Sequence, residues 1–141
     1  MAVRKLKHIR QSLSTSCGPA CLAILARETE SEAIKAIFAG RDPSEGMRTR
    51  WPQLRRGMSK LRLRFEDPVR RVSDWSRIPE TAIVGCGKRK DPKGRDIWHW
   101  VVYQSDGNGS GLVYDPERAV PYVPNGRHRK PFSYLPVVPR L

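Results

Sequence analysis

Apolar residues in the first half of the chain recur at the three- and four-residue spacing that is typical of helices. The run that begins at Cys17 is almost wholly apolar, as expected of a buried helix. The two runs that follow carry apolar residues on one face and charged or polar residues on the other. We therefore expect helices over residues 17–27, 31–38 and 51–61.

In the second half of the chain the period changes to two, which indicates strands. The strongest candidate covers residues 97–103. Residues 106–111 are dense in turn-forming Asp, Gly and Asn, so residues 112–115 should return antiparallel to this strand. Residues 134–138 are flanked by prolines, which favours an edge strand. Further short strands are expected over residues 61–65 and 81–86.

Helices followed by strands predict an α+β fold in which N-terminal helices pack on a C-terminal antiparallel sheet. With 141 residues and no dividing linker, the chain is expected to form one domain over residues 1–141. No apolar run approaches the roughly 20 residues of a membrane span. The basic N-terminus is followed by polar residues rather than an apolar signal core, so we expect a cytoplasmic protein. Export by a dedicated secretion system stays open.

The charge of the chain bears on the choice of partner. A hydrophobic content of 38% excludes a disordered chain, but 27 Lys and Arg against 14 Asp and Glu leave a formal net charge of +13. Many of these cations lie in the segment Arg48–Arg71. The segment is either a solvated face or a surface for an acidic protein partner. A nucleic acid is less favoured, because too few aromatics interleave with the arginines and no nucleic-acid motif occurs.

Four residues far apart in the sequence suggest a site. Cys17 opens the first predicted helix, where the helix dipole and unbonded N–H groups favour a thiolate. His99 lies in the strongest predicted strand and Asp115 ends its hairpin partner, so the two should meet at one end of the sheet. A cysteine nucleophile needs such a base and a group that orients it. Gln11 can donate its side-chain amide to an oxyanion beside the N–H of Cys17.

The same residues have other interpretations. Cys17 is alternatively a buried core thiol, as Cys21 and Cys86 are expected to be. A zinc site made from the three cysteines and His99 is disfavoured, because Cys-x3-Cys on a helix is a poor zinc spacing. We therefore expect no metal and no cofactor. Asp106 competes for the role of Asp115, but its Asp-Gly-Asn-Gly context favours a turn.

Together these residues resemble the C39 peptidases of the papain-like cysteine protease superfamily. The resemblance covers nearly the whole chain, although Ser16 stands where the family often has Asp. It implies a papain-like α+β fold and a peptide or protein substrate. In the family, a leader peptide is cut after a Gly-Gly-type site. The matching residues, in order and spacing, are Gln11, Cys17–Leu22, His99–Val102 and Tyr114–Pro116.

The resulting hypothesis is a cysteine peptidase. Cys17 attacks a peptide carbonyl, His99 carries the proton and Asp115 orients His99, while Gln11 stabilises the oxyanion. Two alternatives stay open. The same triad could serve a toxin-like deamidase or acyltransferase. A catalytically silent domain could instead use its cleft and basic surface to bind a partner.

Overall fold

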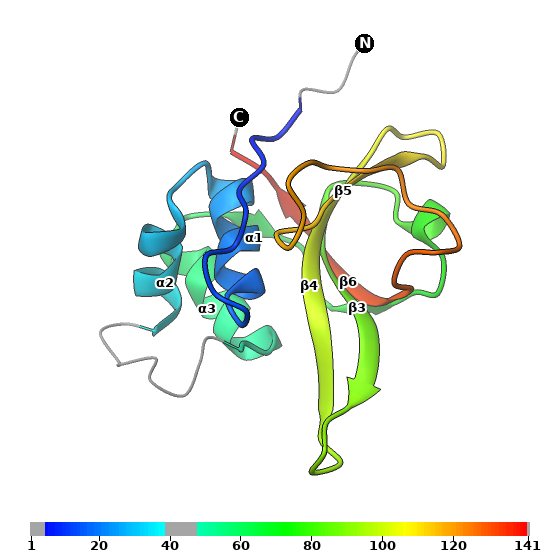
Figure 1. The fold of residues 1–141 in the computed structure, drawn as a ribbon. Coiled ribbons are helices and arrows are strands. Elements are labelled where there is room, and N and C mark those ends of the chain that lie inside the picture. Colours follow the sequence, from blue (N-terminus) through cyan, green and yellow to red (C-terminus); the bar gives the residue numbers. More distant parts are fainter. Residues whose placement is uncertain (1–4, 39–47, 141) are drawn as a thin grey trace.

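The computed structural model describes residues 5–38 and 48–140, with helices gathered on one side of a sheet (Figure 1). Helices α1 (Cys17–Ala26), α2 (Glu30–Phe38) and α3 (Trp51–Lys60) confirm the predicted helices to within one residue at each end. The predicted α+β arrangement, N-terminal helices packed against a C-terminal antiparallel sheet, is confirmed as well. No helix in the described part of the chain is long and apolar enough to cross a bilayer.

Helix α1 forms the centre of the helical layer. All its residues are buried, and it packs against α2, α3 and the long strand β4 (Asp96–Ser105). A helix surrounded on all sides needs no polar face, which explains its uniformly apolar sequence. Cys17 is therefore the first residue of a helix that its surroundings hold in place.

The sheet is antiparallel throughout, with β2 paired beside the main order β1-β6-β3-β4-β5. The predicted hairpin is confirmed, because Val102 of β4 pairs with Tyr114 of β5. Strand β5 stops there, so it leaves the edge of β4 at His99 uncovered. The remaining bounds are β1 (Arg64–Phe65), β2 (Arg70–Arg71), β3 (Ala82–Lys90), β5 (Gly111–Tyr114) and β6 (Pro131–Val138).

The prediction of an edge strand over residues 134–138 was wrong. Strand β6 begins at Pro131 and lies inside the sheet, with β3 on one side and β1 and β2 on the other. Its internal Pro136 is tolerated because the proline lacks an N–H only on a side where no strand needs it. In a β-strand, the N and C=O of one residue point toward the same neighbouring strand. The carbonyl of Pro136 accepts from the N–H of Glu66, in the gap between β1 and β2. The N of Pro136 therefore faces that gap, and its missing N–H costs no hydrogen bond to β3.

The strand expected over residues 61–65 is also shorter than predicted. Only Arg64 and Phe65 pair with β6. The preceding residues turn out of α3: Arg62 has a φ of 59°, and the N–H of Leu63 bonds the carbonyl of Met58. Alternating apolar and basic residues here reflect a helix end, not a strand. Strand β2 and the short 3-10 helix η1 (Trp75–Arg77) were not predicted.

The two faces of the sheet carry separate apolar clusters. Trp98 and Trp100 pack with the helical core, as the alternation in β4 predicts. The other face holds Val101 and Tyr103 together with Val84 and residues of the long loops. Strand alternation places His99 on this second face, at the uncovered edge of β4.

Candidate active site

Cys17 and His99 lie together in a cleft of about 570 Å³ between the start of α1 and strand β4. Both residues line this cleft, and the neighbouring Cys17 raises the pKa of the His99 ring. His99 Nε2 is 2.6 Å from Asp115 Oδ1, which leaves Nδ1 as the nitrogen available to the thiol. Three of the four predicted site residues thus come together, in the order nucleophile, base and base-orienting acid.

The first turn of α1 is open toward this cleft. Ser16 precedes the helix, but its side chain makes no cap hydrogen bond. Its hydroxyl instead donates to the carbonyl of Leu13 and contacts Glu30. The first N–H groups of a helix have no partner within the helix. The backbone N–H of Cys17 can therefore donate a hydrogen bond to an oxyanion.

Close packing at Gly18 fixes the position of this first turn. A Cβ atom at Gly18 would lie 2.1 Å from Thr49 Oγ1 and 3.3 Å from Leu54. The Thr49 segment is held in turn, because Trp100 Nε1 donates to its carbonyl at 3.0 Å. The glycine after the nucleophile is therefore required by packing against the other wall of the cleft.

Gly18→Ala is expected to destabilise the fold by about 1–3 kcal/mol, because the new methyl group overlaps Thr49. Thr49→Ala removes the overlapping hydroxyl and should recover part of this loss. Denaturant unfolding of the two single variants and the double variant measures the coupling. Strictly additive effects would contradict the contact.

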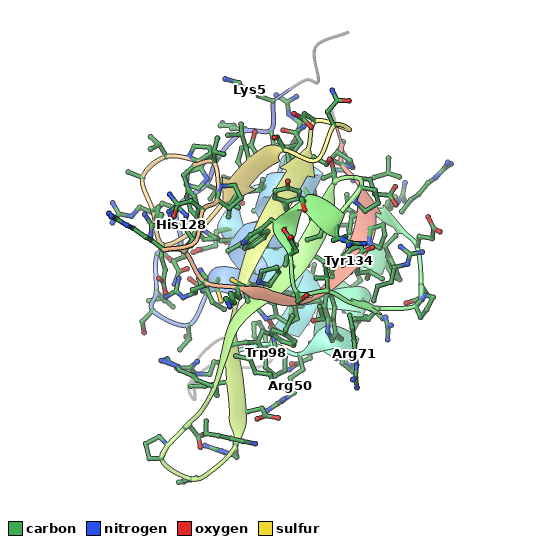
Figure 2. The ribbon with its side chains drawn as sticks, turned by 90° about the vertical axis from the view of Figure 1, so that its right-hand side faces the viewer. Lys5, Arg50, Arg71, Trp98, His128 and Tyr134 are labelled. Carbon is green, nitrogen blue, oxygen red and sulfur yellow. The ribbon has the colours of Figure 1, made fainter. Side chains whose placement is uncertain are left out.

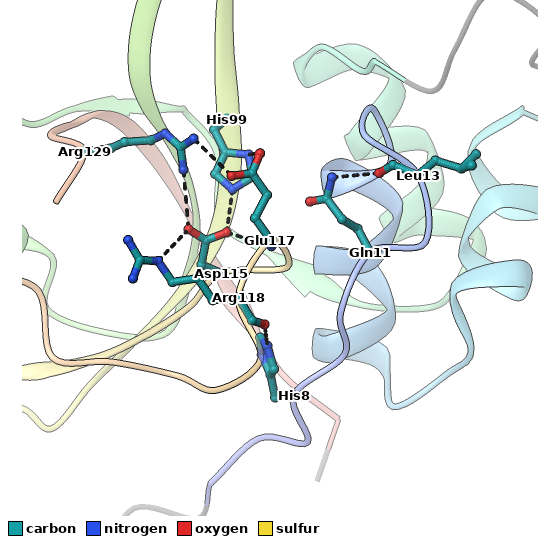
Figure 3. Close-up of polar contacts among 8 residues, drawn as sticks. All are labelled: His8, Gln11, Leu13, His99, Asp115, Glu117, Arg118 and Arg129. Atoms are coloured by element: carbon teal, nitrogen blue, oxygen red, sulfur yellow. Dashed lines mark hydrogen bonds and ion pairs between the residues drawn. The ribbon is translucent and has the colours of Figure 1, made fainter.

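Asp115 is held as a carboxylate by several donors. It is only 1% exposed, and it also accepts from the N–H of Glu117 at 2.9 Å. Arg129 Nη1 and Arg118 Nε lie 3.5 and 3.8 Å from its other oxygen (Figure 3). Burial by itself raises the pKa of Asp115, but the hydrogen bond and charge of His99 and the other donors lower it below its usual range.

His99 is held in its charged form by the same contacts. Burial lowers the pKa of His99, but the hydrogen bonds and charges of Asp115 and Cys17 outweigh it and raise the pKa to about 9. At neutral pH an imidazolium therefore faces the Cys17 sulfur.

The free energy of unfolding is expected to fall as the pH rises from about 6.5 to about 9. Folding raises the pKa of His99, so its contribution is complete below 6.5 and is lost as the pH rises through 9. Thermal unfolding of the wild type and of His99→Gln between pH 6 and 10 measures this contribution. It is the difference between the two proteins in the slope of Tm against pH. Parallel curves for the two proteins would contradict it.

Glu117 is a site residue that the sequence did not suggest. Its Oε1 lies 3.7 Å from His99 Nδ1, the ring nitrogen that Asp115 does not hold, and its Oε2 lies 3.1 Å from Arg129. It follows Asp115 in a tight turn in which its own N–H bonds the Asp115 carboxylate. The Asp-Pro-Glu sequence, read as such a turn, would have placed it here.

The three residues His99, Asp115 and Glu117 offer ligand atoms within 4.8 Å of one another. They do not fit one metal ion, because the two carboxylates approach opposite nitrogens of the same ring. The guanidinium of Arg129 also lies 3.5 Å from the Asp115 carboxylate and 3.1 Å from that of Glu117, where it competes with a bound cation. The cluster is better suited to holding an imidazolium than to holding a metal.

Gln11 lies beside the site but does not aim its amide into it. Its backbone N–H bonds the carbonyl of Pro116, directly after Asp115. Its Nε2 donates to the carbonyl of Leu13 at 2.7 Å, and its Oε1 is buried without a hydrogen-bond partner (Figure 3). The predicted oxyanion role requires the amide to leave Leu13, and it stays a prediction.

The other cysteines and the competing aspartate take the structural roles expected of them. Cys21 and Cys86 are buried, and burial raises the pKa of both thiols. No metal-ligand group among the described residues includes either cysteine. Asp106 accepts from the N–H groups of Asn108 and Ser110 within the β4–β5 turn.

No family model and no curated protein compared with the chain matches the chain. The function of the chain is therefore inferred from the geometry of this cleft.

Proposed function

We propose that this chain is a cysteine peptidase with a papain-like fold of the C39 type. The observation that carries the proposal is that Cys17 and His99 line one cleft, and that a buried aspartate holds one nitrogen of the His99 ring at 2.6 Å. This arrangement supplies a nucleophile, a proton carrier and its orienting group in one cleft. The resemblance of the same residues to the C39 peptidases supports a peptide substrate.

The reaction follows from these positions. The Cys17 sulfur bonds to the carbonyl carbon of the substrate, and the negative charge that forms on the carbonyl oxygen is stabilised by the Cys17 N–H. His99 gives the proton on Nδ1 to the leaving amine as the C–N bond breaks, which leaves a thioester on Cys17. His99 then takes a proton from water, and the resulting hydroxide breaks the thioester to release the acid. Gln11 joins as a second oxyanion donor if its amide turns away from Leu13.

The direct test is to incubate the protein with a mixture of peptides, including Gly-Gly-containing ones, and to identify products by mass spectrometry. Two fragments that sum to substrate plus water show peptidase activity. The reaction must disappear in Cys17→Ala. Intact peptides that carry a side-chain acid in place of an amide would show a deamidase. Transfer of the acyl group to an added amine would show an acyltransferase.

A cleft that binds peptides equally well in the wild type and Cys17→Ala, with no turnover in either, would point to a catalytically silent binding domain. Reaction of Cys17 with iodoacetamide tests the thiol without any peptide. It therefore distinguishes a silent domain from an enzyme whose substrate is missing from the mixture. A cysteine nucleophile beside its base should be alkylated at neutral pH faster than a free cysteine peptide. A slower reaction would overturn the proposed function.

A further inference from the structure

The cleft that holds Cys17 carries more positive charge than its reaction requires. Its lining includes four arginines and two carboxylates, and both carboxylates already have cationic partners. Asp96 pairs with Lys90 and Lys88, at 2.6 and 3.7 Å, and Glu117 pairs with Arg129. The other arginines of the lining have no carboxylate partner within the described residues: Arg48, Arg50 and Arg89.

A β-bulge sets the face of the sheet on which one of these arginines lies. Cys86 pairs with His99, but further along the hairpin Arg89 pairs with Ile97, so β3 contains one extra residue at this point. Without it, Arg89 would pair with Asp96 and face the side of Trp98. Directly paired residues share a face, so the bulge brings Arg89 to the face of Ile97 and His99.

The bulge also lets Arg129 approach the site. Gly87 has a left-handed φ of 64°, and a Cβ atom there would lie 2.7 Å from Arg129 Cδ. The absence of a side chain at Gly87 thus leaves room for Arg129 in the position from which it reaches Asp115 and Glu117. The same irregularity therefore affects the placement of two of the arginines that line the cleft.

The opposite wall supplies the other two arginines. Arg50 is fixed, because its Nη2 donates to the carbonyl of Asp96 and its guanidinium lies 5.1 Å from the Trp98 ring centroid (Figure 2). Arg48 is exposed and, like Arg89, makes no ion pair within the described residues. Exposed cations in a concave site raise the local concentration of anions and their rate of entry.

We infer that this cleft selects peptides with acidic side chains next to the bond that Cys17 attacks, with Arg48 and Arg89 as the residues that bind the carboxylates. The inference rests on the proposed function and names its substrate class. A peptide is favoured over a nucleic acid, because the nucleophile in the same cleft acts on a carbonyl carbon. Arginine binds carboxylates through paired N–H donors, which gives the selection a preferred geometry.

The test compares alkylation of Cys17 by anionic iodoacetate and by neutral iodoacetamide. Both reagents react with the same thiolate, so the ratio of their rates reports the charge of the cleft and not the fraction of thiolate. The rate with iodoacetate divided by the rate with iodoacetamide is expected to fall about tenfold or more in Arg48→Glu/Arg89→Glu. This effect should shrink in high salt. The control is Arg64→Glu/Arg71→Glu, which makes the same charge change at exposed positions of β1 and β2 outside the cleft lining. Equal ratios in both double variants would overturn the inference.

The second measurement is protection of Cys17 from iodoacetamide by added polymers. A Glu-rich peptide should protect the wild type, and a Gln-rich peptide of the same length should not. Protection should be lost in Arg48→Glu/Arg89→Glu. Protection by a single-stranded oligonucleotide alone would overturn the peptide assignment. Failure of the proposed function is recognised separately, as slow alkylation by iodoacetamide itself, whereas failure of this inference leaves that reaction fast but insensitive to charge.

Discussion

Cys17→Ala is expected to lower kcat/KM for peptide hydrolysis by a factor on the order of 10⁴ or more, because no other group can form the thioester. The matched control is Cys21→Ala, which removes a buried thiol one turn further along the same helix. We expect this control to keep its activity. Hydrolysis assays on both variants, with thermal unfolding to verify folding, measure the difference.

Labelling makes the same prediction independent of the substrate. One equivalent of iodoacetamide should enter the native wild type and the Cys21→Ala variant, and none should enter Cys17→Ala. This follows from the raised pKa of both other thiols, which burial keeps neutral and inaccessible. Activity that survives in Cys17→Ala would remove the nucleophile from the proposed mechanism altogether.

Asp115→Ala is expected to reduce both activity and stability. Removing this buried carboxylate leaves His99, Arg118 and Arg129 without their shared negative partner, at a cost of about 3–5 kcal/mol in the free energy of unfolding. It also frees the ring of His99 to rotate. We expect kcat/KM to fall by about 10³- to 10⁴-fold in the fraction that stays folded.

Asp115→Asn separates charge from orientation. The amide can still hold the ring in place, but it cannot stabilise the imidazolium, so the pKa of His99 should fall below its value of about 9. The alkaline limb of the pH–rate profile should therefore move to lower pH, with an activity between those of the wild type and Asp115→Ala. Measurement of kcat/KM from pH 5 to 10 tests this order. An unchanged alkaline limb would show that the limb does not report His99.

Glu117 gives the site a second carboxylate near the reacting atoms. It lies on the Nδ1 side of His99, where the proposed mechanism transfers the proton, and Arg129 holds it there. Its side chain is 42% exposed, compared with 2% for Asp115, so its charge is more strongly screened by solvent. Asp115 therefore contributes more than Glu117 to keeping His99 charged.

Much of the fold could be predicted because it depends on local sequence. The three helices follow from apolar spacing, and the β4–β5 hairpin follows from a strong strand next to a glycine-rich turn. The meeting of His99 and Asp115 follows from the same hairpin, since both lie just beyond its last paired residues. These features need only the periods of helix and strand, which a single sequence contains.

The position of β6 could not be predicted in this way. Prolines argue for an edge, and only the gap between β1 and β2 makes an internal proline acceptable. That gap depends on how three separate segments pair, which is not a local property. The same holds for the strand expected at residues 61–65, where the end of α3 accounts for residues 61–63 and only residues 64 and 65 pair as a strand.

In the candidate site, Cys17, His99 and Asp115 could be proposed from the sequence, because each stands at a recognisable point of a predicted element. What surrounds them follows only from the packing of the elements. The bulge at Gly87, the approach of Arg129 and Glu117, and the bond from Gln11 to Leu13 arise where distant segments meet. The physical reason is that local periodicity fixes the direction of a side chain within its own element. The partners and the charge around that side chain depend on contacts between elements, which no local pattern specifies.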